Sequence, residues 1–284
     1  MSIQIDPVRR NLRFALPPGR ALNWNPAGLH VTQFFNTLSL FFPAGERFFI
    51  QSVRHFRNDI DDAALKAQIS AFIGQEGFHT REHEEYNDAL KAAGMPVQAM
   101  ERIVEGLLEA VKRLPPSLQL AATVALEHLT AVLGDMLLRN DALLADTEPH
   151  FAALWRWHAL EETEHKAVCF DAYEQVVGRD ARGYAQRVLA FVLANVLFWG
   201  LFLPFYAVMV TRAGGLFRLG GWWKVTQLVL GRPGVLRRAL PDWADFFRRD
   251  FHPWQHDNRT FLAQAPALME AVAAFSDTGM EARA

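Results

Sequence analysis

The sequence contains almost no cysteine: Cys169 is the single one among 284 residues. One cysteine cannot form an intramolecular disulfide, so a disulfide-stapled secreted fold is excluded and a reducing compartment is favoured. The first twenty residues also lack the continuous apolar core of a signal peptide, and we therefore do not expect secretion. The net charge is only −2 and no nucleic-acid-binding motif is present, so nucleic acid is not an expected partner.

A sustained alternation with a period of two, the pattern of a half-buried strand, is also missing. Apolar residues instead recur at helical spacing through most of residues 30–210. Long helices joined by short connections predict an all-α protein built on a four-helix bundle. The expected helices cover residues 31–56 with a break or kink at Pro43, 62–93, 97–114, 118–140 with Ser117 as the cap, and 149–177.

One stretch carries far more charge than its apolar neighbours lead us to expect, namely WHALEETEHKAVCF. On a helix, residues three and four apart lie on the same face, so His158, Glu162 and His165 point in one direction. Glu161 and Glu164 point elsewhere, and we expect them on a solvated face.

A second stretch, QEGFHTREHEE, places Glu76, His79 and His83 on one helix face by the same spacing. Two further glutamates lie within predicted helices whose neighbouring residues are mostly apolar. Glu46 lies in FFPAGERFFI and Glu127 in VALEHLTAVL, each at a position where a hydrophobic core residue would be expected.

Four carboxylates inside an apolar bundle would repel one another unless they were protonated or held by cations. Intervals of 30 residues from Glu46 to Glu76 and 35 from Glu127 to Glu162 each suit one helical hairpin. One Glu from each of two helices plus a Glu-x-x-His from each of two others is the ligand set of ferritin-like di-iron and di-manganese bundles. Ligands without thiolate favour iron, with manganese or a mixed pair second. The predicted ligands of two metal ions are Glu46, Glu76, His79, Glu127, Glu162 and His165.

Several of these stretches resemble a known family. FFPAGERFFIQSVRHF, FIGQEGFHTREHEEYN, ALEHLTA, WHALEETEHKAVCFD and FHPWQHDN look like the bacterial family described as predicted metal-dependent hydrolases, which is placed among the ferritin-like folds. The likeness extends from about Trp24 to Asn258. The H-x-x-x-E-x-x-H pattern is also similar to that of di-iron arylamine N-oxygenases, in which an extra histidine completes a seven-ligand site. This implies His158 as a seventh metal ligand, with His83 as its rival; the other histidine would then contact a ligand carboxylate.

Two neighbouring metal ions can activate a bridging water for hydrolysis or bind O2 and oxidise a substrate. The negative charge of four glutamates favours high oxidation states of the bound metal ions. We therefore rank first an O2-activating oxidase or oxygenase that acts on a small or hydrophobic organic substrate. Its catalytic carboxylates would be Glu46, Glu76, Glu127 and Glu162. The alternative is a metal-dependent hydrolase that uses a metal-bound hydroxide, as the family description says. A ferroxidase or iron-storage protein is the second alternative, against which the long C-terminal region argues.

Residues 188–210 form an apolar run of 23 residues without a charged side chain, which makes about 34 Å of helix, enough to cross a bilayer. The alternatives are a fully buried bundle helix or a homodimer interface. Residues 212–259 contain nine Lys and Arg against four Asp and Glu and many aromatic residues, as expected of a membrane interface. We therefore expect association with the cytoplasmic side of the inner membrane through 188–210.

These features divide the chain into three expected regions. An extended N-terminal arm covers residues 1–29, a ferritin-like metal-binding helical bundle covers 30–180, and an apolar helix followed by an aromatic and basic helical region covers 181–284. His128 points away from the face of its neighbour Glu127, so we expect it in the core or on the bundle surface, outside the metal site.

Overall fold

The computed structural model describes residues 5–232 and 234–281, so residues 1–4 of the predicted arm and residues 233 and 282–284 of the predicted C-terminal region lie outside it. Within the described residues the chain is all-helical and contains no strand, which confirms the predicted all-α class and the helical bundle. The helices are α1 (Leu29–Ser39), α2 (Phe42–Arg54), α3 (Ala63–Ala92), α4 (Val97–Val111), α5 (Pro116–Leu138), α6 (Pro149–His165), α7 (Val168–Val176), α8 (Ala181–Arg212), α9 (Leu219–Val229), α10 (Val235–Asp245) and α11 (Ala265–Glu281), with short 3-10 turns at Pro18–Arg20, Asp141–Leu143, Pro253–Gln255 and Arg259–Gln264.

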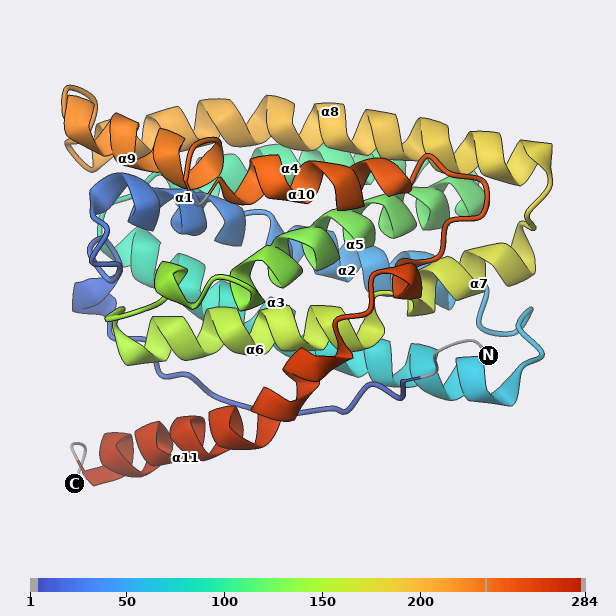
Figure 1. Cartoon of the computed structure of the whole chain (residues 1–284), viewed down its shortest axis with the longest axis horizontal. Coiled ribbons are helices and arrows are strands. Elements are labelled where there is room, and N and C mark those ends of the chain that lie inside the picture. The colour runs from blue at the N-terminus through green and yellow to red at the C-terminus, as the bar shows by residue number, and fades with distance from the viewer. Residues whose placement is uncertain (1–4, 233, 282–284) are drawn as a thin grey trace.

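Four helices form the centre of the molecule. α2 packs against α3, α5 packs against α6, and contacts between α2 and α5 and between α3 and α6 join the two pairs. α4 covers α2 and α3, while α8 lies along α5 and α1 (Figure 1). The last helix, α11, lies at the edge of the bundle and packs against α6, where the Phe275 ring stacks on His150 (Figure 1).

The predicted helix over residues 62–93 is confirmed by α3. Its cap is Asp62, whose side chain accepts hydrogen bonds from the backbone N–H groups of Ala64 (2.8 Å) and Leu65 (3.2 Å). The predicted break near Pro43 is also confirmed, because α1 ends at Ser39 and α2 has Pro43 in its first turn. Proline is tolerated there since the first N–H groups of a helix have no intrahelical partner.

Two predicted boundaries are wrong. α5 begins at Pro116 with Pro115 as its cap, so Ser117 lies in the first turn instead of capping the helix. The single helix expected over residues 149–177 is two helices, α6 and α7, because the chain departs from α-helix at Lys166. There the buried Lys166 Nζ donates to His256 O (2.6 Å), a tertiary contact that helical periodicity does not encode.

The N-terminal arm reaches across the bundle before the first helix begins. Residues 5–17 form no regular element and pass along α3 and α6 (Figure 1). Phe14 and Trp24 are buried, and the indole of Trp24 stacks on the Phe151 ring with centroids 5.2 Å apart. Apolar anchoring of this kind fixes the arm on the bundle without secondary structure.

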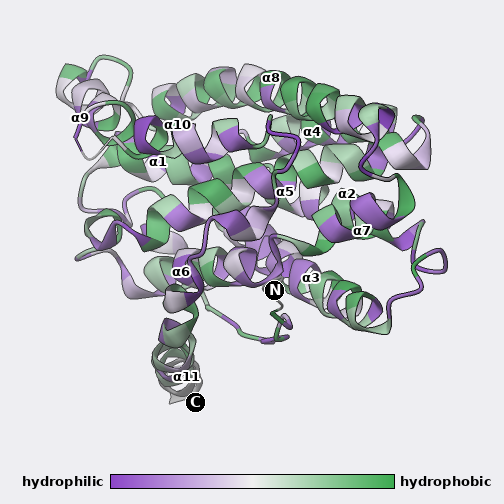
Figure 2. Cartoon of the chain, turned by 45° about the vertical axis from the view of Figure 1, so that its right-hand side comes forward, coloured by the Kyte–Doolittle hydropathy of each residue, from purple (hydrophilic) through white to green (hydrophobic). Residues whose placement is uncertain are grey.

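α8 contains the uncharged run over residues 188–210, and hydrophobic residues follow most of its length (Figure 2). One face packs on α5 and α1, whereas the opposite face exposes side chains such as Val196 (64% exposed) and Leu203 (59%). The fully buried alternative is therefore wrong. α8 and α5 are both long and apolar enough to cross a membrane, but 78% of the α5 window is buried inside the protein against 22% for α8.

A buried hydrogen-bond hub joins the arm to the bundle. Asn36 Oδ1 accepts from Trp24 Nε1 (2.9 Å) and from the Tyr86 hydroxyl (2.6 Å), and Asn36 Nδ2 donates to Ala21 O (3.0 Å). All three partners are buried. Such a hub connects the N-terminal arm, α1 and α3 at one point.

We predict that Asn36→Ala lowers the free energy of unfolding by about 3 kcal/mol, because buried partners lose their hydrogen bonds without gaining water. Urea denaturation measures this change. The control is Asn58→Ala in an exposed turn, which should change the free energy by less than about 0.5 kcal/mol. Equal effects of the two substitutions would contradict the hub.

Candidate metal centre

The eight predicted metal-site residues converge in the interior of the bundle, where none is more than 3% exposed. Each central helix contributes at least one. They are Glu46 from α2, Glu76, His79 and His83 from α3, Glu127 from α5, and His158, Glu162 and His165 from α6. Spacings of three and four residues on α3 and α6 bring the side chains of each helix to the face that meets the other helices.

The ligand atoms gather in four overlapping groups, in each of which they lie within 4.8 Å of one another. The groups are Glu46 with Glu76 and His79, Glu76 with Glu127 and His165, His79 with His158 and Glu162, and Glu46 with His83 and His158. Glu76 belongs to two of these groups and His79 to two. Shared members mean that the groups form one continuous cluster, large enough for more than one ion.

The donor atoms at the centre of this cluster have no hydrogen-bond partner. Both carboxylate oxygens of Glu46, Glu76 and Glu127 are buried and unpaired, as are His79 Nδ1 and His165 Nε2. Buried polar atoms are nearly always hydrogen-bonded, so eight unpaired ones on five residues point to a missing partner. Oxygen and imidazole nitrogen donors are those that iron, manganese and zinc accept, and the residues therefore fit a metal.

The electrostatics point the same way. Burial raises the pKa of Glu46, Glu76 and Glu127 well above the usual range of a carboxyl group, and the neighbouring carboxylates raise it further. For Glu162, burial also acts to raise the pKa, but His165 and the hydrogen bond with His158 outweigh it and lower the pKa. Without a cation the three other carboxyl groups favour their protonated forms, so bound cations are what would let them ionise.

Each central histidine is oriented by a hydrogen bond on its outer nitrogen. His79 Nε2 bonds to Glu161 Oε2 (3.1 Å), which turns Nδ1 toward the cluster. His165 Nδ1 bonds to Gln75 Oε1 (2.9 Å), so its Nε2 lies 3.2 Å from Glu76 Oε1. Partners of this kind fix the tautomer and the orientation of metal-binding histidines.

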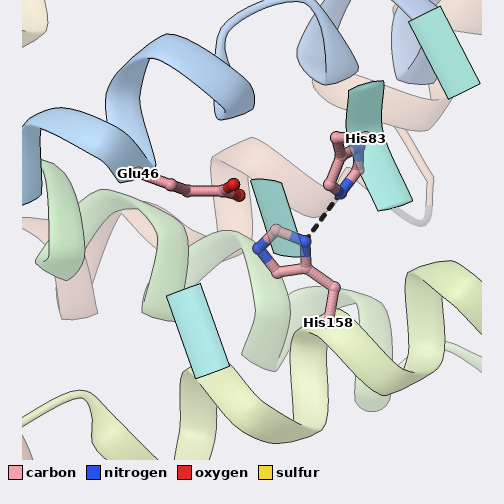
Figure 3. Close-up of side chains that lie close together, drawn as sticks. All are labelled: Glu46, His83 and His158. Carbon is pink, nitrogen blue, oxygen red and sulfur yellow. Dashed lines mark hydrogen bonds between the residues drawn. The ribbon is translucent and has the colours of Figure 1, made fainter. Parts of the chain in front are cut away.

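The rivals His158 and His83 bond to each other, as Figure 3 shows, with His83 Nε2 2.8 Å from His158 Nδ1. The second nitrogen of His158 lies 3.0 Å from Glu162 Oε1, inside the cluster. The second nitrogen of His83 points outward to Ser39 Oγ (2.9 Å). Both nitrogens of each histidine thus have partners, but one partner of His158 is the central carboxylate of Glu162, whereas the partners of His83 are Ser39 and His158.

Glu161 and Glu164 do not lie on a solvated face, and that prediction is wrong. Their exposed fractions are 0% and 5%. Arg10 from the N-terminal arm contacts Glu161 Oε1 at 3.2 Å and Glu164 Oε1 at 2.5 Å. Gln75 donates to Glu164 Oε2 (2.8 Å) and meets His165 at its other end. Arg10 is thus connected to His79 through Glu161, and to His165 through Glu164 and Gln75.

Arg10 and Gln75 support the cluster but are not among the residues predicted from the sequence. A usable signal is the composition of α6, in which Leu154, Trp155, Trp157 and Leu160 lie on several sides of the helix. A helix that is apolar all round is buried all round. Its remaining glutamates then need partners from elsewhere in the chain, although the sequence does not say which.

The other histidines lie outside the cluster. His128 packs among Phe191, Phe246 and Phe251 in the core, one of its two predicted locations. His252 Nε2 bonds to Asp171 Oδ1 (2.9 Å) and helps to hold the C-terminal segment on α7.

We predict that Arg10→Leu lowers the free energy of unfolding by about 3 kcal/mol, because Glu161 and Glu164 would remain buried without their cation. Burial already raises the pKa of Glu161 to about 8, and loss of Arg10 raises it further. The matched control is Arg13→Leu in the same arm, whose side chain is 54% exposed and whose loss should cost little. If the denaturation curves of the two variants coincided, the role of Arg10 as the partner of Glu161 and Glu164 would be contradicted.

The comparisons with known proteins bear on the same residues. The model of a family described as "Predicted metal-dependent hydrolase" matches residues 8–257, a range that includes Arg10 and all eight residues of the cluster. No curated protein and no solved structure matches the chain. The resemblance noted from the motifs is thereby confirmed at the level of the family, while the likeness to arylamine N-oxygenases stays a prediction. Because the match covers most of its length, the chain belongs to the family of predicted metal-dependent hydrolases.

Proposed function

We propose that this protein is a metal-dependent hydrolase with two metal ions in the bundle centre. The observation that carries the proposal is the set of eight buried donor atoms without partners, contributed by α2, α3, α5 and α6. The family description supports hydrolysis. The ferritin-like arrangement, with a lone Glu and a Glu-x-x-His from alternate helices, supports the pair of ions.

In this proposal the two ions would be held by residues whose ligand atoms fall in overlapping groups. They are Glu46, Glu76, His79, Glu127, His158, Glu162 and His165. His158 is the seventh ligand and His83 orients it. Iron is the first candidate, with manganese or a mixed pair second, because no thiolate contributes.

Bound ions of this kind polarise a water molecule and the bond that it attacks. The chain itself positions the ligands and keeps solvent out. The only cysteine of the sequence, Cys169, is buried, and burial raises the pKa of its thiol well above the usual range, so it is poorly suited to act as a nucleophile. Water is therefore the attacking group in this proposal.

Oxidation with O2, ranked first from the sequence alone, is the second candidate, because the family description favours hydrolysis. One observation favours oxidation: the cluster borders a cavity of about 400 Å3 whose lining is apolar except at Glu46 and Thr130. A substrate without a polar group to cleave fits such a lining. Iron or manganese held by the carboxylates of this site would supply the redox chemistry for such a substrate.

Metal analysis tests the ligands. We predict about two equivalents of metal per chain in protein purified without added metal, and loss of at least one equivalent in Glu76→Ala and in Glu162→Ala. Circular dichroism should show that helix content is largely kept. Glu84→Ala, an exposed position on the same helix α3, is the control and should keep full occupancy. Full occupancy in either ligand variant would contradict the site.

A comparison of two assays separates the reactions. Hydrolysis predicts turnover of ester or phosphoester substrates by the metal-loaded protein without O2, and loss of this turnover in Glu76→Ala. Oxidation instead predicts a transient visible absorption band when the anaerobically reduced protein meets O2. That band without any ester or phosphoester turnover would replace hydrolysis by the second candidate.

A further inference from the structure

The apolar cavity beside the cluster has an unusual composition. It is lined by side chains from α2, α4, α5 and α8, and among its lining residues only Glu46 and Thr130 carry polar side chains. Its volume of about 400 Å3 lies in the range of small-molecule sites. A cavity with so few polar side chains along its walls selects a ligand mainly by shape and apolar surface.

Both polar residues belong to the metal cluster or contact it. Glu46 is a predicted ligand whose carboxylate oxygens have no hydrogen-bond partner. Thr130 Oγ1 donates to Glu162 Oε2 at 2.6 Å. The polar end of the cavity therefore coincides with the predicted reactive centre, and the rest of the cavity leads away from it.

The cavity is elongated. Its walls follow α5 from Leu118 to Leu133 and α8 from Leu189 to Leu201, which correspond to about 22 Å and 18 Å of helix. This length, together with the apolar lining, suits an extended hydrocarbon chain.

The cavity opens on the surface between α4 and α8. Leu114 follows the end of α4, and Leu189, Leu193 and Leu197 lie on α8; all four line the cavity and are 42–57% exposed. α4 packs on α2 and α3 whereas α8 packs on α5 and α1, and Figures 1 and 2 both place α4 beside α8. The same leucines thus belong to the cavity wall and to the outer surface.

The surface around this opening is apolar and its ends are basic. Exposed apolar side chains continue along α8 to Leu203 and beyond it to Phe217 (90% exposed) and Trp223 (65%). Exposed Arg182 and Arg212 lie near the two ends of α8. An apolar face with cations at its ends complements an anionic lipid surface, whereas a second copy would place like charges against each other.

We propose that the cavity binds a single unbranched hydrocarbon chain, which enters from a lipid layer through the opening between α4 and α8 and ends at Glu46. α8 then lies on the layer and does not cross it, because its inner face is packed on α5 and α1. The ligand class is a single-chain amphiphile, such as a fatty acid or its ester. Reaction of this ligand rests on the proposed function, but its binding does not.

Ligand binding is tested with metal-free protein and a fluorescent fatty acid, cis-parinaric acid, displaced by palmitic acid. We expect saturable binding by the unaltered chain and at least about tenfold weaker binding by Ala194→Phe, which fills the cavity from α8. The matched control is Ala207→Phe, an exposed position on α8 outside the cavity, which should bind like the unaltered chain. No saturable binding, or equal binding by Ala194→Phe with unchanged circular dichroism, overturns the proposal.

The route is tested with vesicles. The protein should co-sediment with phosphatidylcholine vesicles that contain phosphatidylglycerol. The double variant Val196→Asp, Leu203→Asp should no longer co-sediment with them. It should still bind cis-parinaric acid, because neither residue lines the cavity. Met269→Asp on α11 is the control with an exposed apolar residue elsewhere. Entry from a lipid layer would be overturned if the protein did not bind the vesicles and instead formed a dimer that the double substitution disrupts.

The two proposals can fail separately. Fatty-acid binding by a protein that never holds metal would retain the cavity proposal and remove the proposed function. If the protein binds two metal ions but no fatty acid, the proposed function would be retained and the cavity proposal removed.

Discussion

The structure depends on the cost of placing four carboxyl groups in a dry protein interior. An isolated ionised carboxylate is strongly disfavoured there, and several together repel one another. Three of the four, on Glu46, Glu76 and Glu127, have no hydrogen-bond partner, whereas Glu162 is held by His158 and Thr130. A bundle whose centre needed only to be packed would contain hydrophobic residues at these positions. Their presence fits a centre that can hold a cation to compensate them.

The surroundings of the cluster are arranged to keep this centre in place. Around the imidazoles lies a layer of side chains, Gln75, Glu161 and Glu164, that fixes which ring nitrogen faces inward. Arg10 neutralises that layer from outside. On the opposite side, Thr130 connects Glu162 to an apolar cavity. The centre is thus polar and rigid toward the N-terminal arm, and apolar and open toward α8.

Helical periodicity and the chemistry of buried charge predict much of this from the sequence. They predict the all-α class and the extent of α3, and they bring Glu46, Glu76, Glu127 and Glu162 to one interior. They do not predict contacts between distant segments. The wrong assignment of Glu161 and Glu164 arose because their partner, Arg10, lies about 150 residues earlier in an arm without regular structure. The end of α6 was missed for a similar reason, since Lys166 meets a segment about ninety residues later.

The position of Arg10 has a consequence for how the protein is assembled. Its partners lie on α6, so the arm cannot take its final place until most of the bundle has been synthesised and α6 has docked. Before that moment Glu161 and Glu164 lack their guanidinium partner, although Glu161 and Gln75 already cover the outer nitrogens of His79 and His165. Docking of the arm therefore completes the polar layer behind the two imidazoles and is coupled to the packing of α6.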